Sequence, residues 1–356
     1  MRSRYLQVAV FLAAAAAVQL AAVQGGRAFW LTQLTMSAYY TLVVAGLSLF
    51  MGYAGQISLG HAGFFAVGGY ASAALTTWDL AARRGEPLVS ALSRAGVLVG
   101  RPDLYGGQVL VVHPWPAAIC AVALAMALAF LVGIPVLKLR GHYLAMATLG
   151  VGTILYSIAL GTSQLGSADG ISGVPPFPLL PGLAVSGDRS LRISNYYVAV
   201  LLLALGVLLL LNLVHSRVGR ALRAIHGAED AAGAMGVDTA RYKLQTFILS
   251  AVLASAAGVL LTHFNGGIGP SEASIMKSVK YVAVVAVGGM GSLWGTVGTS
   301  LVLNFLSLRG YFGTFDDAVF GAVLVAVMLF APDGVLGLDL RRALAAVRRQ
   351  APPEKA

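Results

Sequence analysis

The sequence has very little charge and almost no cysteine. Charged residues make up 11% of its 356 residues, whereas a soluble domain has about 25%. The single cysteine, Cys120, excludes a disulfide framework and a cysteine-based metal site. Apolar residues reach 58%, and the mean hydropathy is +0.81. No soluble fold has enough interior for so much apolar surface, so this composition excludes a soluble enzyme, a nucleic-acid binder and a disordered protein.

The sequence also lacks the motifs of an enzyme. No segment has the spacing of a phosphate-binding loop, and no Gly-Lys pair occurs, so energy from ATP would have to come through a partner. The six histidines are scattered, and no nucleophile has an evident base beside it. We therefore predict no catalytic residue, no metal site and no cofactor.

Acidic residues are scarce in the apolar runs. Glu272 falls in a predicted loop, and Asp316 and Asp317 fall at the edge of the last run. A proton relay needs a titratable group at membrane depth. This scarcity counts against a proton-coupled secondary transporter.

Ten apolar runs follow one another along the chain, and each approaches the length of about 20 residues that crosses a bilayer. They cover residues 5–23, 31–51, 57–77, 115–137, 142–161, 195–214, 244–265, 275–289, 293–308 and 317–331. We predict an all-α, polytopic integral membrane protein with about ten transmembrane helices, in one domain that covers residues 1–356. The helices beside the glycine turns at 52–55 and 288–291 are candidates for broken or re-entrant helices.

The positive charges indicate the topology. The chain carries 24 Lys and Arg against 14 Asp and Glu, a formal charge of +10. Cytoplasmic loops of membrane proteins collect Lys and Arg, so we interpret the excess as topology and predict no nucleic-acid partner. Both termini are then cytoplasmic. The segments assigned to loops are 78–114 and 162–194 outside, and 215–243 and the tail 332–356 inside.

One polar patch lies within the apolar runs, in residues 52–64, which read GYAGQISLGHAGF. Gln56, Ser58 and His61 lie there at predicted membrane depth, among several glycines. Glycine allows a helix to unwind and free its carbonyl groups to line a cavity. The patch is either part of a translocation pathway or a tightly packed helix entry with a structural histidine.

A second polar patch is the charged segment 216–238. Three arginines at three-residue spacing share one helix face, and a turn follows at Gly227. Glu229 and Asp230 suit the positive start of a short helix, and Gly236 suits its end. The segment is either a compact cytoplasmic knob or an ordinary solvated loop.

These patches carry a resemblance to a known family. GYAGQISLGHAGFFAVGGYASA resembles the signature of LivM-type permease subunits of branched-chain amino-acid ABC importers. The similarity continues in RGHYLAMATLGVGTI, DGISGVPP, SRVGRALRAIHGAEDAAGAMGVD, GGMGSLWGTVGTSL and FAPDGVLGL. The resemblance implies a type II ABC importer permease fold in the prokaryotic cytoplasmic (inner) membrane.

The resemblance also implies partners and site residues. Two related permease subunits form the pathway in the lipid bilayer, two separate ATPase subunits supply energy, and an extracytoplasmic binding protein delivers the amino acid. The segment 227–236 matches the helix that couples permease to ATPase. Its expected coupling residues are Gly227, Glu229, Asp230, Ala231, Ala232, Met235 and Gly236, with Ala231, Ala232 and Met235 packed in a groove of the ATPase.

Two alternatives remain open at this point. Similar permeases serve urea or short amides, and the external binding protein largely sets the choice of substrate. A stand-alone secondary transporter is the alternative from another class. Uptake by this chain without any ATPase would favour it.

Overall fold

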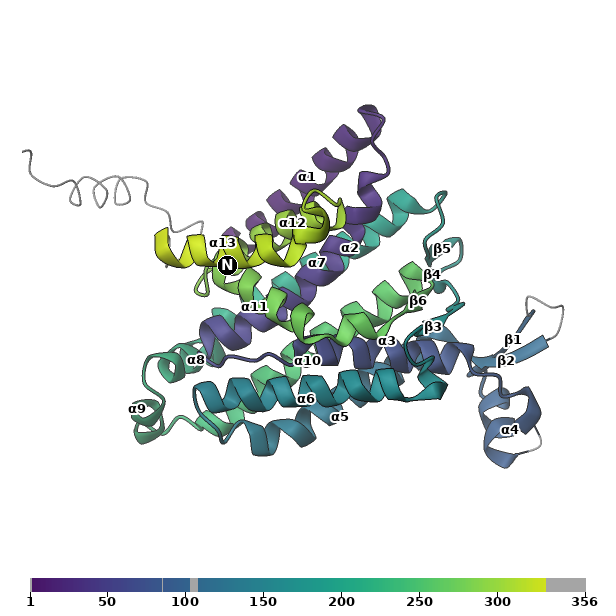
Figure 1. Cartoon of the computed structure of the whole chain (residues 1–356), viewed down its shortest axis with the longest axis horizontal. Coiled ribbons are helices and arrows are strands. Elements are labelled where there is room, and N and C mark those ends of the chain that lie inside the picture. Colours follow the sequence, from purple (N-terminus) through teal and green to yellow (C-terminus); the bar gives the residue numbers. More distant parts are fainter. Residues whose placement is uncertain (1, 85, 103–107, 331–356) are drawn as a thin grey trace, which may run out of the picture.

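The structure is a computed structural model that describes residues 2–84, 86–102 and 108–330 (Figure 1). The predicted tail 332–356 lies outside the described residues. Within them the chain is mainly helical, as the sequence predicts. The α-helices are α1 Arg2–Gln24, α2 Trp30–Ser48, α3 His61–Thr77, α4 Pro87–Arg94, α5 Pro114–Val136, α6 His142–Gly161, α7 Arg192–Val214, α8 Arg217–Gly227, α9 Glu229–Ala234, α10 Thr239–Asn265, α11 Ile275–Gly288, α12 Leu293–Leu308 and α13 Asp316–Phe330.

Short strands and single turns connect the helices. The strands form three antiparallel pairs, β1 with β2, β3 with β6 and β4 with β5. They are β1 Leu98–Pro102, β2 Gln108–Val112, β3 Ile171–Ser172, β4 Phe177–Leu180, β5 Leu183–Val185 and β6 Gly267–Ile268. The turns are the π-helical η1 Leu49–Tyr53 and the 3-10 helices η2 Ala81–Arg83, η3 Ser163–Leu165, η4 Pro270–Ala273 and η5 Gly313–Phe315.

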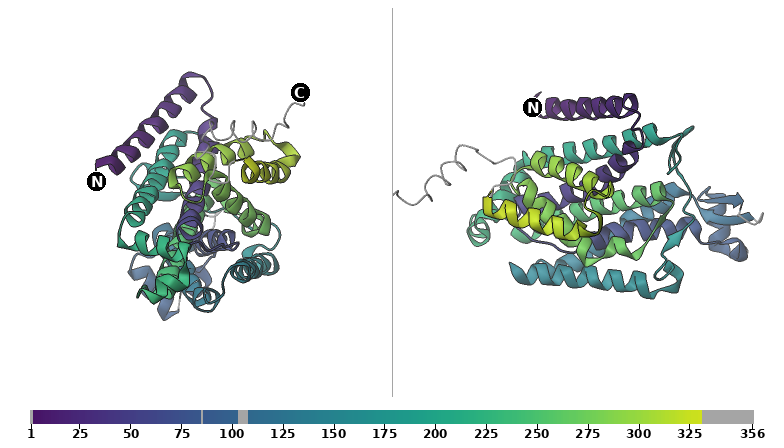
Figure 2. Two further views of the ribbon diagram at one scale, coloured as in Figure 1. Left: turned by 90° about the vertical axis from the view of Figure 1, so that its left-hand side faces the viewer. Right: turned by 45° about the horizontal axis from the view of Figure 1, so that its top comes forward.

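The long helices run between two ends of the molecule. In Figure 1, α8 and α9 lie at the left, the α8–α9 end, and the strands lie at the right, the strand end. α3 and α10 pack most extensively against each other, α5 packs against both, and α2 packs against α7, α10 and α12. Tyr39, Phe50, Phe64 and Phe247 are fully buried in this core. The first helix, α1, lies along the outside of the bundle (Figure 2).

Every predicted apolar run contains a helix, but the helices differ in length. In the part of the chain that the structure describes, six are long and apolar enough to cross a membrane: Tyr5–Gln24, Trp30–Tyr53, Pro114–Val136, His142–Gly161, Arg192–Val214 and Thr239–Asn265. The other four, α3 and α11 to α13, have 14 to 17 residues. The structure therefore supports a polytopic membrane protein in which six helices have the length of a full crossing and four are shorter.

The lengths of α10 and α11 place the start of α11 deep in the bundle. The 27 residues of α10 extend about 40 Å, and the 14 residues of α11 about 21 Å. The start of α10 lies at the α8–α9 end, because it contacts α9. The end of α11 lies there too, because the next residues include Met290, which contacts Gly52 near α8. The chain returns from the strand end through β6 and η4. It begins α11 about halfway across.

The third run differs from its predicted bounds, because α3 begins at His61 and not at residue 57. Gly55 has a φ of +69°, which ends the π-helical turn of α2. Residues 55–60 are then irregular, and the carbonyl of Thr148 lies so near Gly60 that a Cβ there would be 2.7 Å from it. Close packing against α6 thus delays the start of α3.

The predicted loop 78–114 is folded in its described part. It holds η2, α4 and the β1–β2 hairpin, which bury Val89, Leu98 and Leu110 in a small core beside the start of α5. Asp79 connects this unit to α3, since its carboxylate accepts hydrogen bonds from the backbone N–H of Leu110 at 2.9 Å and of Ala81 at 2.8 Å. Both bonds favour the charged carboxylate and lower the pKa of Asp79.

We expect Asp79→Ala to loosen the hairpin, because the Leu110 amide loses its acceptor. Because the pKa of Asp79 is lower in the folded protein, its carboxylate stabilises the fold at any pH above the pKa of a free aspartate. This stabilisation is lost as the pH falls through the folded-state pKa. Hydrogen exchange of the peptide 108–112 should be faster in the variant at pH 7, and the wild-type hairpin should approach the variant at low pH. Ser90→Ala, which removes an exposed bond within α4, is the control. Equal exchange in Asp79→Ala and wild type would contradict this role.

Candidate functional site

The predicted pathway residues lie where α2 gives way to α3. Gln56 follows Gly55 and donates to the carbonyl of Ala54 at 3.2 Å. Ser58 and His61 are almost completely buried, at 1% and 0% exposure. Gln56 and Ser58 therefore lie in a break between two helices, and His61 begins the helix after it, next to the glycine turn that the sequence marks as a candidate break.

Both ring nitrogens of His61 have hydrogen-bond partners. Ser58 Oγ lies 3.0 Å from Nδ1, and Ser250 Oγ of α10 lies 2.8 Å from Nε2. Ser250 donates its own proton to the carbonyl of Phe247, so it must accept from Nε2–H, and Nδ1 accepts from Ser58. His61 is thus assigned as a neutral ring that joins α3 to α10. In this conformation it is the structural histidine of the second sequence interpretation.

The two glycine turns of the sequence lie against each other. A Cβ on Gly52 would be 1.7 Å from the carbonyl oxygen of Met290, so only glycine allows this approach. The hydroxyl of Tyr53 donates to the carbonyl of Gly291 at 3.2 Å. The break after α2 and the turn between α11 and α12 therefore pack directly against each other.

The charged segment contacts the first of these glycine turns through α8. His226, in the last turn of α8, donates from Nδ1 to the carbonyl of Gly52 at 2.9 Å. Gly55 packs directly against the same side chain. We name the contact between His226 and the turn at residues 52–55 the glycine junction. It connects the segment beside α9 to the broken helix that holds Gln56, Ser58 and His61.

The knob predicted at residues 227–236 is present. Gly227 ends α8, and the short helix α9 begins at Glu229, with acidic residues in its first turn. Gly236 follows with a φ of +83°, the left-handed conformation expected at a helix end. Ala231 and Met235 are exposed, and Met235 reaches 85% exposure.

Ala232 differs from the expectation that it packs against a partner. Its side chain is buried within this chain, at 6% exposure, so it attaches α9 to its own protein. The six-residue helix has only one inward face, and Ala232 occupies it. Of the three residues expected in the groove, Ala231 and Met235 are on the exposed side of α9.

Two ion pairs hold the knob, and they differ in burial. Glu229 pairs with Lys243 of α10 at 2.6 Å, and Lys243 also donates to the carbonyl of Leu137 after α5. Asp230 pairs with Arg140 at 2.8 Å on the exposed surface. The hydrogen bond from Arg140, with its charge, lowers the pKa of Asp230. Glu229 therefore attaches α9 to α10 and, through Lys243, to the end of α5.

Sequence reasoning missed a group of charges at the start of α11. Glu272 of η4 pairs with Lys277 at 3.1 Å, and Lys280 pairs with Asp316 and Asp317. The expectation that acids stay outside the bundle is wrong for Glu272, because η4 folds back from the strand end. Two lysines three residues apart within an apolar run were the available signal. They are costly there unless they have partners.

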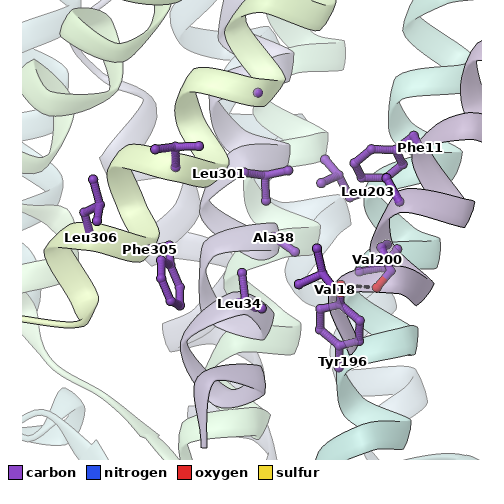
Figure 3. A pocket seen from close by; sticks show the side chains of 14 residues that line it. Phe11, Val18, Leu34, Ala38, Tyr196, Val200, Leu203, Leu301, Phe305 and Leu306 are labelled. Carbon is purple, nitrogen blue, oxygen red and sulfur yellow. Dashed lines mark hydrogen bonds between the residues drawn. The ribbon is translucent and has the colours of Figure 1, made fainter. Parts of the chain in front are cut away.

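A large cavity elsewhere has no such chemistry. It has a volume of about 380 Å³ and lies between α1, α2, α7 and α12 (Figure 3). Its lining is apolar except for the hydroxyl of Tyr196, which already donates to the carbonyl of Ala15 at 3.0 Å. Such a lining fits hydrocarbon and offers no partner for the charges of an amino acid. Within the described residues, no three His, Cys, Asp or Glu side chains are placed to hold a metal ion.

The fold defines a multi-pass membrane protein. Apolar spans, a broken helix and a surface knob joined to that break form the frame of such a protein. The family described as the permease component of the branched-chain amino acid transport system matches residues 29–332. The chain belongs to this family and is a permease subunit of the inner membrane, not an enzyme.

Individual relatives agree with this assignment. The high-affinity branched-chain amino acid permease protein LivM of Escherichia coli K12 is 30% identical over 85% of this chain and 68% of LivM. LivH of the same strain is 26% identical over 85% of this chain and 92% of LivH. BraD of Pseudomonas aeruginosa is 26% identical over 85% of this chain and 93% of BraD. No solved structure is significantly similar to this chain.

Proposed function

We propose that this chain is the permease subunit of an ATP-driven importer of branched-chain or related hydrophobic amino acids. It would pair with a second permease subunit, and two cytoplasmic ATPase subunits and an external binding protein would complete the importer. The names of the LivM, LivH and BraD relatives support the substrate class. The α8–α9 end would then face the cytoplasm with both termini, and segments 78–114 and 162–194 would face outside.

The glycine junction is the observation that carries the coupling proposal. The knob, with Ala231 and Met235 on its surface, would dock on an ATPase subunit and move with it. His226 would pass this movement to Gly52 through their hydrogen bond. The break beside Gln56, Ser58 and His61 would then rearrange as the pathway opens, because ATP favours one of two conformations of the permease pair.

We expect Met235→Glu to uncouple the importer. A carboxylate in place of an exposed apolar side chain would have to be desolvated in an ATPase groove, and its cost should reduce uptake about tenfold or more. The measurement is ATP-dependent leucine uptake by the complete complex in proteoliposomes, with ATP hydrolysis measured in parallel. Hydrolysis should continue without proportionate uptake.

Ser93→Glu is the matched control, because Ser93 is exposed on α4 at the other end of the molecule. Wild-type uptake in Met235→Glu would reject the docking surface. Uptake by the isolated chain without ATPase subunits would instead indicate a stand-alone transporter, and uptake of urea or an amide in place of leucine would reject the substrate class.

A further inference from the structure

The charge group at the start of α11 has the composition of an amino-acid binding site. Lys277 Nζ lies 3.1 Å from Glu272 Oε1 and 3.0 Å from the hydroxyl of Tyr40, which in turn donates to Glu272 at 3.0 Å. The ammonium of Lys277 also lies 4.2 Å from the centre of the Tyr40 ring. One acid, one base and one phenol thus form a closed, partly buried triangle about halfway along the bundle.

The triangle leaves hydrogen-bonding capacity unused. Glu272 Oε2 and the hydroxyls of Tyr70 and Tyr281 have no hydrogen-bond partner among the residues that the structure describes. Tyr70 and Tyr281 are 5% and 3% exposed, so these hydroxyls cannot rely on bulk water. An ammonium has three donor protons, and Lys277 uses two of them. The unused groups are thus one carboxylate oxygen of Glu272 and three donors, namely the two tyrosine hydroxyls and the third proton of the Lys277 ammonium.

The position of the triangle favours a ligand over a purely structural pair. Lys277 lies 11 residues before the end of α11, about 17 Å from the α8–α9 end of that helix. A bilayer core is about 30 Å thick, so the triangle lies well inside it. Charged groups at this depth are costly and mark functional sites. The side chains of Lys277 and Glu272 keep 27% and 20% exposure, so part of the pair lies at the surface of this chain.

The start of α11 adds to the positive side of the site. Ser274 caps the backbone N–H of Lys277, and the positive end of the helix lies together with the Lys277 ammonium. This arrangement favours a carboxylate. Beside Glu272, Ala273 of η4 belongs to an apolar cluster with Ala66, Tyr70 and Ile268. The site therefore combines an anion-binding side, a cation-binding side and an apolar wall.

We infer that this triangle is an intramembrane binding site for a zwitterionic amino acid, an inference that rests on the proposed function. The α-ammonium binds the free oxygen of Glu272, and the α-carboxylate binds Lys277, the start of α11 and a tyrosine hydroxyl. The apolar cluster contacts the branched side chain. Substrate binding requires the Glu272–Lys277 pair to separate, and the zwitterion replaces each lost contact with one of the same charge.

Three variants test this site in the complete importer complex. Glu272→Gln, Lys277→Met and the neutral double variant should each lower ATP-dependent leucine uptake about tenfold or more, since each removes a charged substrate contact. ATP hydrolysis without binding protein and the thermal midpoint of the double variant should stay near wild type. Restored uptake in the double variant would overturn the inference. A pair with only a structural role can lose both charges at little cost, because no unpaired charge is left buried.

Lys280→Met combined with Asp316→Asn is the matched control. It removes Lys280 and one of its two carboxylate partners, one turn further along the same helix, and leaves only the half-exposed Asp317 charged. Leucine uptake should stay within about twofold of wild type, because neither side chain belongs to the proposed site. An equal loss in this control would also overturn the inference. If the wild-type complex imports a different amino acid instead of leucine, only the proposed substrate is wrong, and the same variants test the site with that amino acid. Import of an uncharged substrate in place of amino acids rejects both.

Discussion

Gly258→Ala should separate α3 from α10 and destabilise the protein strongly. A Cβ at Gly258 would be 2.0 Å from the carbonyl oxygen of Phe65, and opposite, a Cβ at Gly68 would be 2.4 Å from the carbonyl of Ser255. These collisions are with backbone atoms, which cannot rotate away as a side chain can. We expect a loss of about 3 kcal/mol or more, the upper part of the range for overpacked cores.

The thermal midpoint of the purified complex and the amount of chain recovered from membranes measure this effect. Gly150→Ala is the matched control, because Gly150 lies within α6 and a Cβ there would have no neighbour within 4 Å. The control should be unchanged or slightly more stable, since alanine favours a helix. Similar midpoints for both variants would show that α3 and α10 adjust easily.

Lys243→Met should have the second large effect, because it leaves Glu229 without its partner in a partly buried position. The side chains of Lys243 and Glu229 are 4% and 17% exposed, so water screens the pair weakly. Breaking a buried pair on one side costs about 3–5 kcal/mol, and the partial exposure of Glu229 places this pair at the lower end. We expect α9 to detach from α10 and from the end of α5.

Protease sensitivity of the 228–236 segment and leucine uptake by the complex report this detachment. Arg140→Gln breaks the exposed pair with Asp230 and should change neither measurement, because exposed pairs contribute little. Removing both charges, in Lys243→Met with Glu229→Gln, should recover part of the loss. If Lys243→Met leaves the segment protected, contacts such as that of Ala232 are sufficient to hold the knob.

The sequence predicted the spans well where apolar runs have sharp ends. The predicted runs 142–161 and 293–308 coincide with α6 and α12. The lengths of these runs follow from local composition. At residues 57–60 the prediction was wrong, because contact with Thr148 on a distant helix determines where α3 begins.

The other features that the sequence did not predict depend on contacts between residues that are far apart in the chain. Nothing in the local pattern indicates that His226 reaches Gly52, 174 residues away. The buried triangle escaped prediction for the same reason. Glu272 and Lys277 look like charges at a helix end until η4 is seen to fold back between α3 and α6. The role of the coupling segment stays a prediction that the Met235→Glu and Lys243→Met variants test, and the pathway role of Gln56, Ser58 and His61 stays a prediction.

Because α1 packs weakly on the bundle, its position should depend on the lipid or detergent around the protein. Apart from contacts such as that of Tyr196 with Ala15, most of α1 is exposed in the isolated chain. The apolar cavity of Figure 3 lies between α1, α2, α7 and α12, and α1 contacts α12 beside it, where Trp294 donates to Gln7 at 3.1 Å. An empty cavity forfeits dispersion contacts on its walls, so lipid acyl chains that enter it act as packing material. The bilayer then serves as a component of the fold, and the length and saturation of its lipids should affect how firmly α1 is held.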